Sequence, residues 1–322
     1  MLTRRHCLAA LAGAPLVASG VRAQSYPARP IRFVVPYAAG GTTDLVARLV
    51  GERMKEMMGQ PLIVENRPGA GGNVGMAEVA KSEPDGYTIG FGAISTNALN
   101  PHIYKTMSFD PRRDFTAVSL LGTSTIVLEA GPSLPVRSVA EFVAHAKANP
   151  ALRYGTAGNG TSMHLAAILF AKTAGIDLVH VPYRGSAAGI NDMLGGHLPA
   201  MFDNLPASIA QIRDGKLKAL AAAGAARSPA LPDVPTLAES GFPGYAVEPW
   251  FGVYGPAKMP APIVAALNAA LVEALARPDI KQKLAAAGFD AKGSTAAELE
   301  SLTQREYEKF GAVAREAKIA VE

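Results

Sequence analysis

Four loops carry residue types that could bind an anion. They cover residues 36–44, 67–73, 155–162 and 182–186, and each leads into a helical pattern. Glycine lets a ligand approach the backbone closely, and serine and threonine hydroxyls donate hydrogen bonds. The first turn of a helix adds unpaired amides and a partial positive charge. These loops therefore predict the capture of a small anion.

The candidate ligand-binding residues lie on three of these loops. They are Tyr37, Ala38, Ala39, Gly40, Gly41, Thr42 and Thr43 on the first, Gly158, Asn159, Thr161 and Ser162 on the third, and Tyr183 and Arg184 on the fourth. Arg184 could be the counter-charge of a carboxylate or an ordinary solvated arginine. We interpret Asp44 as a helix cap, because its carboxylate would repel an anion.

Each loop also has a simpler interpretation, in which glycine, serine and threonine only cap helices and make turns. A hydrogen bond to a charged group contributes roughly 1.5–3 kcal/mol. Four such bonds offset an association cost of about 4–15 kcal/mol only in a site that is preformed or closes over its ligand. If the loops bind one ligand, they therefore favour a cleft between two lobes.

Short apolar strands alternate with amphipathic helices along the chain, which predicts an α/β protein with a mostly parallel sheet. The predicted strands are residues 31–35, 62–65, 87–91, 126–129, 152–154, 178–181, 200–202 and 217–221. Helical patterns follow most of them, and Ser138 and Glu141 form a capping box at the start of one. Ligands of such sheets sit at the carboxyl ends of the strands, where these loops lie.

The strands form two series, which predicts two α/β lobes with a ligand cleft between them. We assign residues 24–122 plus 246–322 to lobe 1 and residues 123–245 to lobe 2. After Pro256 the pattern is helical, and Thr295 with Glu298 caps the last helix. Trp250 and Phe251 could form the wall of a ligand pocket, although aromatic residues after a Pro/Gly-rich stretch are more often part of the core.

Enzyme motifs are absent from the sequence. It contains no Gly-x-x-x-x-Gly-Lys-Ser/Thr, Gly-x-Ser-x-Gly or His-Glu-x-x-His segment. Ser162 and His164 are two residues apart, so they would point to different faces of a helix and make poor triad partners. The histidines after residue 23 show no metal-ligand spacing. We therefore predict a protein that is not an enzyme and needs no cofactor or metal.

Residues 1–23 resemble a cleaved export signal, with Arg4-Arg5, a short apolar core and a small-residue cleavage pattern ending at Ala23. The arginine pair is compatible with twin-arginine or ordinary export. The single cysteine, Cys7, lies inside this segment, so the mature chain would have no thiol or disulfide. These features predict a periplasmic protein.

Charge and composition exclude several classes of protein. Cleavage after Ala23 would lower the net charge from +4 to +1, which argues against nucleic acid as a partner. The 322 residues are 49% hydrophobic and 18% charged, unlike a disordered chain. No run reaches about 18 consecutive apolar residues, so no spanning helix is expected.

The loops and several further segments resemble one known family, the extracytoplasmic solute-binding receptors of tripartite tricarboxylate transporters, also called the Bug family. The matching segments are residues 30–44, 64–73, 109–115, 158–165, 180–185, 202–206 and 231–236. Together they extend over nearly the whole mature chain. The resemblance implies a type II periplasmic binding-protein fold with a hinge, and a small organic acid held in the cleft.

The resemblance also implies residue roles and partners. The loop from Tyr37 to Thr43 would hold a carboxylate, and Thr161 and Ser162 would donate to it from the other lobe. The segment that contains Ser95, Thr96 and Asn97 would lie near the cleft. Asp203 would accept from a ligand hydroxyl or amine, or only position a loop. The partners would be a small organic acid and inner-membrane tripartite carrier subunits, with the receptor a monomer.

Several alternatives stay open at this point. Dicarboxylates, tricarboxylates, acidic amino acids and aromatic acids all fit the loops. The closed form could be presented to a membrane kinase instead of a permease, which would make the protein a sensor. A periplasmic enzyme acting on carboxylates would need a nucleophile–base pair or a metal set, and the sequence shows neither.

Overall fold

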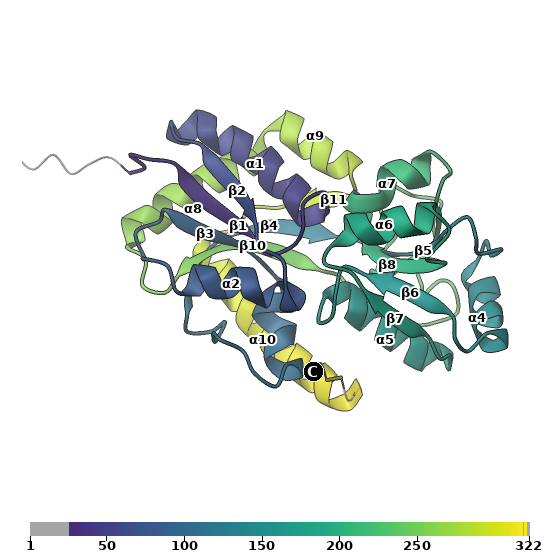
Figure 1. The fold of residues 1–322 in the computed structure, drawn as a ribbon. Coiled ribbons are helices and arrows are strands. Elements are labelled where there is room, and N and C mark those ends of the chain that lie inside the picture. Colours follow the sequence, from purple (N-terminus) through teal and green to yellow (C-terminus); the bar gives the residue numbers. More distant parts are fainter. Residues whose placement is uncertain (1–25, 318, 321–322) are drawn as a thin grey trace, which may run out of the picture.

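The computed structural model describes residues 26–317 and 319–320, so the predicted export signal lies outside the described residues. The chain forms two α/β lobes side by side (Figure 1). No helix within the described ranges is both long and apolar enough to cross a membrane. The predicted α/β fold class is confirmed.

Lobe 1 is built from two separate stretches of the chain. The first contains β1 (Ile31–Val35), α1 (Thr42–Met58), β2 (Leu62–Asn66), the short helix η1 (Ala70–Gly72), α2 (Asn73–Ala80), β3 (Thr88–Ala93), the π-helical turn η2 (Ser95–Leu99), α3 (Asn100–Ile103) and β4 (Phe115–Ser124). The second contains β10 (Trp250–Pro256), α8 (Ala261–Ala276), α9 (Pro278–Ala286), β11 (Phe289–Ala291) and α10 (Ala296–Ala317).

Lobe 2 is built from the stretch between them. It contains β5 (Ile126–Ala130), α4 (Val139–Ala148), β6 (Arg153–Thr156), α5 (Ser162–Ala174), β7 (Val179–Pro182), α6 (Ser186–Leu194), β8 (Ala200–Asn204), α7 (Leu205–Arg213) and β9 (Lys218–Ala222). The lobe bounds 24–122, 123–245 and 246–322 stay a prediction, and we use "lobe" here for the elements of each sheet.

The expectation of mostly parallel sheets is wrong. The strand order is β11-β4-β10-β3-β1-β2 in lobe 1 and β7-β6-β8-β5-β9 in lobe 2. Four of the nine strand pairs are parallel and five are antiparallel. The physical reason is connectivity: β10 returns from lobe 2 and enters lobe 1 between β3 and β4, against their direction.

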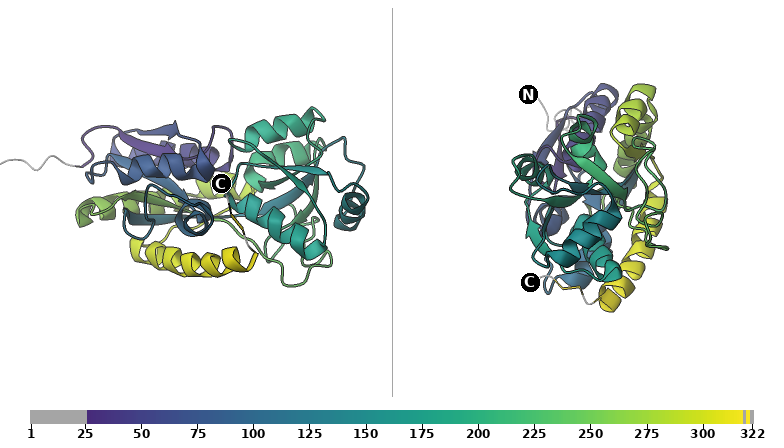
Figure 2. Two further views of the ribbon diagram at one scale, coloured as in Figure 1. Left: turned by 60° about the horizontal axis from the view of Figure 1, so that its bottom comes forward. Right: turned by 90° about the vertical axis from the view of Figure 1, so that its right-hand side faces the viewer.

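Helices cover both faces of each sheet. In lobe 1, α1, α8 and α9 pack on one face around Phe33, Phe91 and Phe251. On the other face, α2, η2 and α10 enclose Trp250 and Tyr254, and α10 runs along the length of the lobe (Figure 2). In lobe 2, α5 packs on one face, and α6 and α7 pack on the other. Each lobe therefore has a main core of its own, and Leu165 of α5 also packs into the lobe 1 cluster around Trp250 and Tyr254.

Two crossing segments connect the lobes and lie beside each other. The first joins β4 to β5 at Thr125, and the second runs back from β9 to β10. The amide of Ser124 donates to the carbonyl oxygen of Pro249 at 3.1 Å, which ties the two crossings together. A paired crossing of this kind is suited to act as a hinge.

Candidate functional site

The first loop positions the N-terminus of α1 at the junction of the lobes. Gly40 has a φ of 82°, a left-handed conformation that favours glycine. Its amide donates to Asp44 Oδ2 at 3.1 Å, and Arg48 pairs with Asp44 at 2.9 Å. Burial opposes ionisation of Asp44, but the hydrogen bonds from Arg48 and Gly40 outweigh it and hold the Asp44 pKa below its ordinary value. Asp44 therefore stabilises the loop from the first turn of the helix.

The third loop positions the N-terminus of α5 opposite α1. Thr161 is the N-cap, and its hydroxyl accepts from the amide of His164 at 3.3 Å. Gly158 and Gly160, with φ values of 136° and 73°, make the turn that precedes it. The amide of Ser162 donates to Ser95 Oγ of lobe 1 at 3.0 Å. This loop therefore reaches across to the other lobe.

The fourth loop brings the N-terminus of α6 to the same place. A Cβ on Gly185 would lie 2.9 Å from the Cβ of Ala38, so only glycine allows this approach between the lobes. Beside it, the amide of Ala38 donates to the carbonyl oxygen of Arg184 at 3.3 Å. The helices α1, α5 and α6 therefore direct their positive ends at one region between the lobes.

A small cavity of about 20 Å³ lies where these helix ends meet, which is room for about one water molecule. Its walls are formed by Tyr37, Ala38, Gly41, Thr42, Thr43, Ala93, Ser95, Ala157, Thr161, Ser162, Met163, Gly185, Ser186, Asn204 and Phe251. None of the described residues that form the wall has a charged side chain. Any anion in this cavity would be held by amides and hydroxyls alone, with an apolar wall beside it.

Eight of the predicted ligand-binding residues line this cavity. They are Tyr37, Ala38, Gly41, Thr42, Thr43, Ser95, Thr161 and Ser162. Tyr37 also donates to the carbonyl oxygen of Gly71 at 3.2 Å. Burial raises the pKa of Tyr37 to about 12, so its hydroxyl keeps its proton at neutral pH.

Nine predicted residues do not face the cavity in this closed arrangement. They are Ala39, Gly40, Thr96, Asn97, Gly158, Asn159, Tyr183, Arg184 and Asp203. Arg184 is exposed, and it does not line the cavity. Tyr183 donates instead to Asp192 at 2.6 Å. Asp203 is fully buried behind Ser186, as a residue that positions a loop would be.

Several cavity residues were not among the predicted site residues. They are Ala93, Ala157, Met163, Gly185, Ser186 and Asn204, together with Phe251, which the sequence indicated only as a possible pocket wall. A local signal existed for two of them. Asn204 precedes Leu205-Pro206, and proline in the first turn marks a helix start with Asn204 as its N-cap. Ser186 follows Gly185 at the start of α6 in the same way.

Two buried carboxyl groups lie beneath one end of the cavity. Val127 pairs with Asp203 and Glu129 with Met201, which places Asp203 and Glu129 on one face of the sheet as diagonal neighbours. Both residues are 0% exposed. Burial raises the pKa of Asp203 to about 7, and burial together with the Asp203 charge raises the pKa of Glu129 well above its ordinary value.

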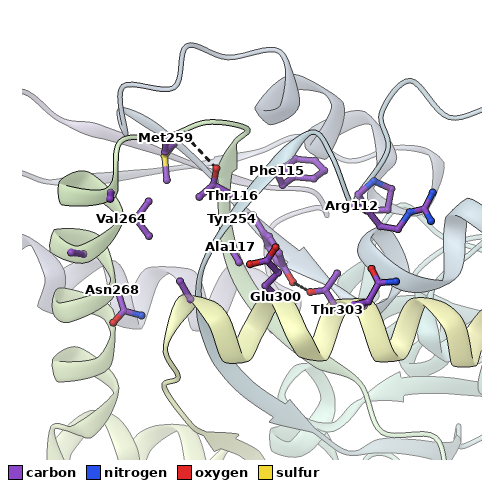
Figure 3. A pocket seen from close by; sticks show the side chains of 15 residues that line it. Arg112, Phe115, Thr116, Ala117, Tyr254, Met259, Val264, Asn268, Glu300 and Thr303 are labelled. Atoms are coloured by element: carbon purple, nitrogen blue, oxygen red, sulfur yellow. Dashed lines mark hydrogen bonds between the residues drawn. The ribbon is translucent and has the colours of Figure 1, made fainter.

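A larger cavity of about 550 Å³ lies away from the cleft, on lobe 1 between α8 and α10. Met259, Val264 and Asn268 line it on the α8 side (Figure 3). Glu300 and Thr303 line it on the α10 side, and Thr303 shares a 2.6 Å hydrogen bond with Tyr254 at its floor. No glycine-rich loop opens into it, so the converging helix ends make the cleft the candidate site.

Comparison with known proteins agrees with this geometry. Residues 46–319 match the model of the tripartite tricarboxylate transporter family receptor. The chain belongs to this family. Its members are periplasmic solute-binding receptors rather than enzymes. This confirms the resemblance deduced from the loops, and the two-lobed architecture agrees with it.

Three similar proteins illustrate the family. Protein BugT of Bordetella pertussis is 34% identical over 93% of the receptor and 93% of its own length. The structure of R. palustris Rpa4515 with adipate is 37% identical, with a TM-score of 0.89 over 92% of the receptor and 99% of that chain. The structure of MatC from Rhodopseudomonas palustris with bound malate is 33% identical, with a TM-score of 0.86 over 89% of the receptor and 99% of that chain.

Proposed function

We propose that this receptor captures a small organic carboxylate in the cleft between its lobes and delivers it to a tripartite carrier of the inner membrane. The observation that carries the proposal is the meeting of three helix N-termini, from both lobes, at one cavity without a charged side chain. Helix N-termini bind anions through their unpaired amides and their positive dipole ends. The similar structures with adipate and malate support a carboxylate as the ligand.

Binding requires the lobes to separate and close again. A cavity of about 20 Å³ is smaller than any organic acid, so the ligand must enter an open form and widen the closed one. Closure of two domains about a hinge is a common way to trap such a ligand. The carrier would then distinguish the closed, loaded receptor from the open one.

A thermal-shift screen of the purified receptor against organic acids and their amides tests the ligand class. A ligand at about 100 times its Kd stabilises the folded protein by roughly 2.7 kcal/mol, a shift of several degrees in Tm. We expect a shift with at least one acid and none with its amide. The protein should first be unfolded in urea and refolded, which removes any ligand retained through purification. Equal shifts with acids and amides, or none at all, would contradict the proposal.

Uptake by cells tests delivery. Cells lacking the receptor should fail to accumulate the radiolabelled acid that the screen identifies, and re-expression should restore uptake. Unchanged uptake without the receptor would leave the binding proposal intact and reject the delivery step.

A further inference from the structure

Two histidines support the third loop without lining the cavity. The amide of Gly160, in the middle of this loop, donates to Nδ1 of His164 on α5 at 3.3 Å. From the neighbouring strand β7, His180 places its Nε2 at 2.7 Å from Thr156 Oγ1. The same hydroxyl accepts from the amide of Gly158 at 3.1 Å. Each of the two glycines that make the turn is therefore held by a histidine, Gly160 directly and Gly158 through Thr156.

The loop that these histidines hold carries binding groups of lobe 2. Thr161 and Ser162 line the cavity. A Cβ on Gly160 would lie 2.6 Å from the ring of Tyr104, so the turn packs closely against lobe 1. The carbonyl oxygen of Asn159 also accepts from the Tyr104 hydroxyl at 3.0 Å. The shape of residues 158–162 thus decides both the contact between the lobes and the direction of the groups that face the cavity.

The hydrogen bond to His164 requires a neutral ring. An imidazole nitrogen accepts a hydrogen bond only when it carries no proton, so Nδ1 of His164 is bare and the single ring proton is on Nε2. A second proton would make Nδ1 a donor that faces another donor, the Gly160 amide. The contact between His180 and Thr156 has no such requirement, because a threonine hydroxyl can accept as well as donate. The loop therefore depends on the protonation state of His164.

The surroundings of the two rings keep them neutral. The titratable side chains that face the pair, among the described residues, are the two rings themselves, with centroids 4.1 Å apart, and Tyr154 of β6, whose ring centroid is 5.0 Å from that of His180. Burial lowers the pKa of His164 to about 4, and burial with the neighbouring ring lowers that of His180 to about 3. Neither ring has a carboxylate partner in the described part of the chain, so a proton on either ring would gain no ion pair.

We propose that His164 is a positioning residue for the ligand: its neutral ring holds the third loop in the shape that faces the cavity, and a proton on Nδ1 releases the loop and the ligand with it. His164 acts through the Gly160 amide and does not itself line the cavity. This inference rests on the proposed function, because that function places the carboxylate at the start of α5, the helix that follows this loop. Acid should therefore weaken binding by more than protonation of the ligand alone explains.

Nitrogen NMR of the wild-type receptor tests the hydrogen bond without any ligand. At pH 7 we expect His164 to carry its proton on Nε2 and to leave Nδ1 bare. As the pH falls, the amide signal of Gly160 should shift together with the titration of His164. The opposite tautomer, or a Gly160 signal that does not follow the titration, overturns the inference and leaves the proposed function standing. This result does not depend on whether any variant folds.

Two substitutions at one position test whether the hydrogen bond serves binding. His164→Asn places an acceptor oxygen where Nδ1 was and cannot be protonated at that site, whereas His164→Leu keeps apolar bulk and removes the acceptor. With adipate and malate as probes in isothermal titration at pH 7, we expect His164→Leu to raise the Kd by about fivefold or more and His164→Asn to stay within about twofold of wild type. His197→Leu, at an exposed position, is the control and should bind normally. Equal weakening in His164→Leu and His164→Asn would mean that the ring acts by packing alone, which overturns the inference.

The pH profile of the same titrations tests the release of the ligand. Between pH 7 and pH 4.5, the Kd of wild type divided by that of His164→Asn should rise about threefold or more, because only the wild-type ring gains a proton when the loop is released. Protonation of the acid itself affects both proteins alike and cancels in this ratio. A constant ratio overturns the inference. If neither acid binds wild type, the NMR titration still decides the role of His164, and the thermal-shift screen decides the proposed function.

Discussion

Ser95 Oγ, at the first residue of η2 in lobe 1, accepts a 3.0 Å hydrogen bond from the amide of Ser162, the first residue of α5 in lobe 2. This bond gives a partner to one of the amides that a helix leaves unpaired at its N-terminus. The hydroxyl of Tyr104 makes a parallel connection to the carbonyl oxygen of Asn159 at 3.0 Å. These contacts hold the cleft closed through groups of the protein itself, so they set how readily it opens.

Removing the Tyr104 hydroxyl should weaken ligand binding without touching the ligand. A hydrogen bond of this kind contributes roughly 0.5–1.5 kcal/mol, so we expect Tyr104→Phe to raise the Kd by about 2- to 12-fold, mainly through faster dissociation. Stopped-flow fluorescence measures the dissociation rate. Tyr307→Phe, on α10, is the control and should bind normally. An unchanged dissociation rate in Tyr104→Phe would show that this contact does not stabilise the closed form.

A methyl group on Gly71 should prevent closure. A Cβ there would lie 2.5 Å from the carbonyl oxygen of Asn159 in the opposite lobe. We expect Gly71→Ala to fold, to bind ligand at least tenfold more weakly, and to have a larger radius of gyration in small-angle X-ray scattering.

The control for Gly71→Ala is Gly59→Ala. Gly59 has a φ of 68°, close to the 61° of Gly71, but nothing lies within 4 Å of its Cβ position. The two substitutions therefore impose similar backbone strain, of order 1 kcal/mol. If both variants lose affinity equally, strain rather than the clash between lobes is the cause.

The pair of Asp203 and Glu129 should make the receptor less stable as the pH rises. Both pKa values are raised in the folded state, so between about pH 4 and 7 the folded protein holds more protons than the unfolded chain. The free energy of unfolding then falls with rising pH, by at most about 1.4 kcal/mol per pH unit for each proton. Glu129→Gln should be more stable than wild type at pH 8, with a smaller difference at pH 4.5. Urea unfolding at both pH values measures this, and a pH-independent difference would contradict it.

The stacked rings of His164 and His180, whose centroids are 4.1 Å apart, should make the receptor less stable as the pH falls. Burial lowers the pKa of His164 to about 4, and burial with the neighbouring ring lowers that of His180 to about 3. The folded state therefore binds fewer protons than the unfolded chain below about pH 6.5, and stability falls as the pH falls. His180→Gln should reduce this loss of folding stability at acid pH. The exposed His197→Gln should leave it unchanged, and equal curves for wild type and His180→Gln would refute the assignment.

Local patterns were reliable where neighbouring residues decide the structure. The predicted cap at Ser138 is present, since Ser138 Oγ accepts from the amide of Glu141 at 3.2 Å, although Glu141 accepts in return from the amide of Arg137, one residue before the N-cap, at 2.7 Å. The first strand and the helix after its loop also form where predicted. By contrast, β4 was not predicted, because a strand that pairs with residues more than a hundred positions away leaves little trace in its own periodicity.

By itself, the sequence determined the α/β class, the loops that could bind an anion and the family, because these depend on periodicity, on glycine and hydroxyl content, and on motifs within a few residues. Tertiary structure alone decided which loop residues share a wall. It brought Ser95 to Ser162, removed Asp203 from the cavity surface and placed Ser186 and Asn204 there instead. The physical reason is that burial and hydrogen-bond direction arise only when the two lobes and their sheets pack together.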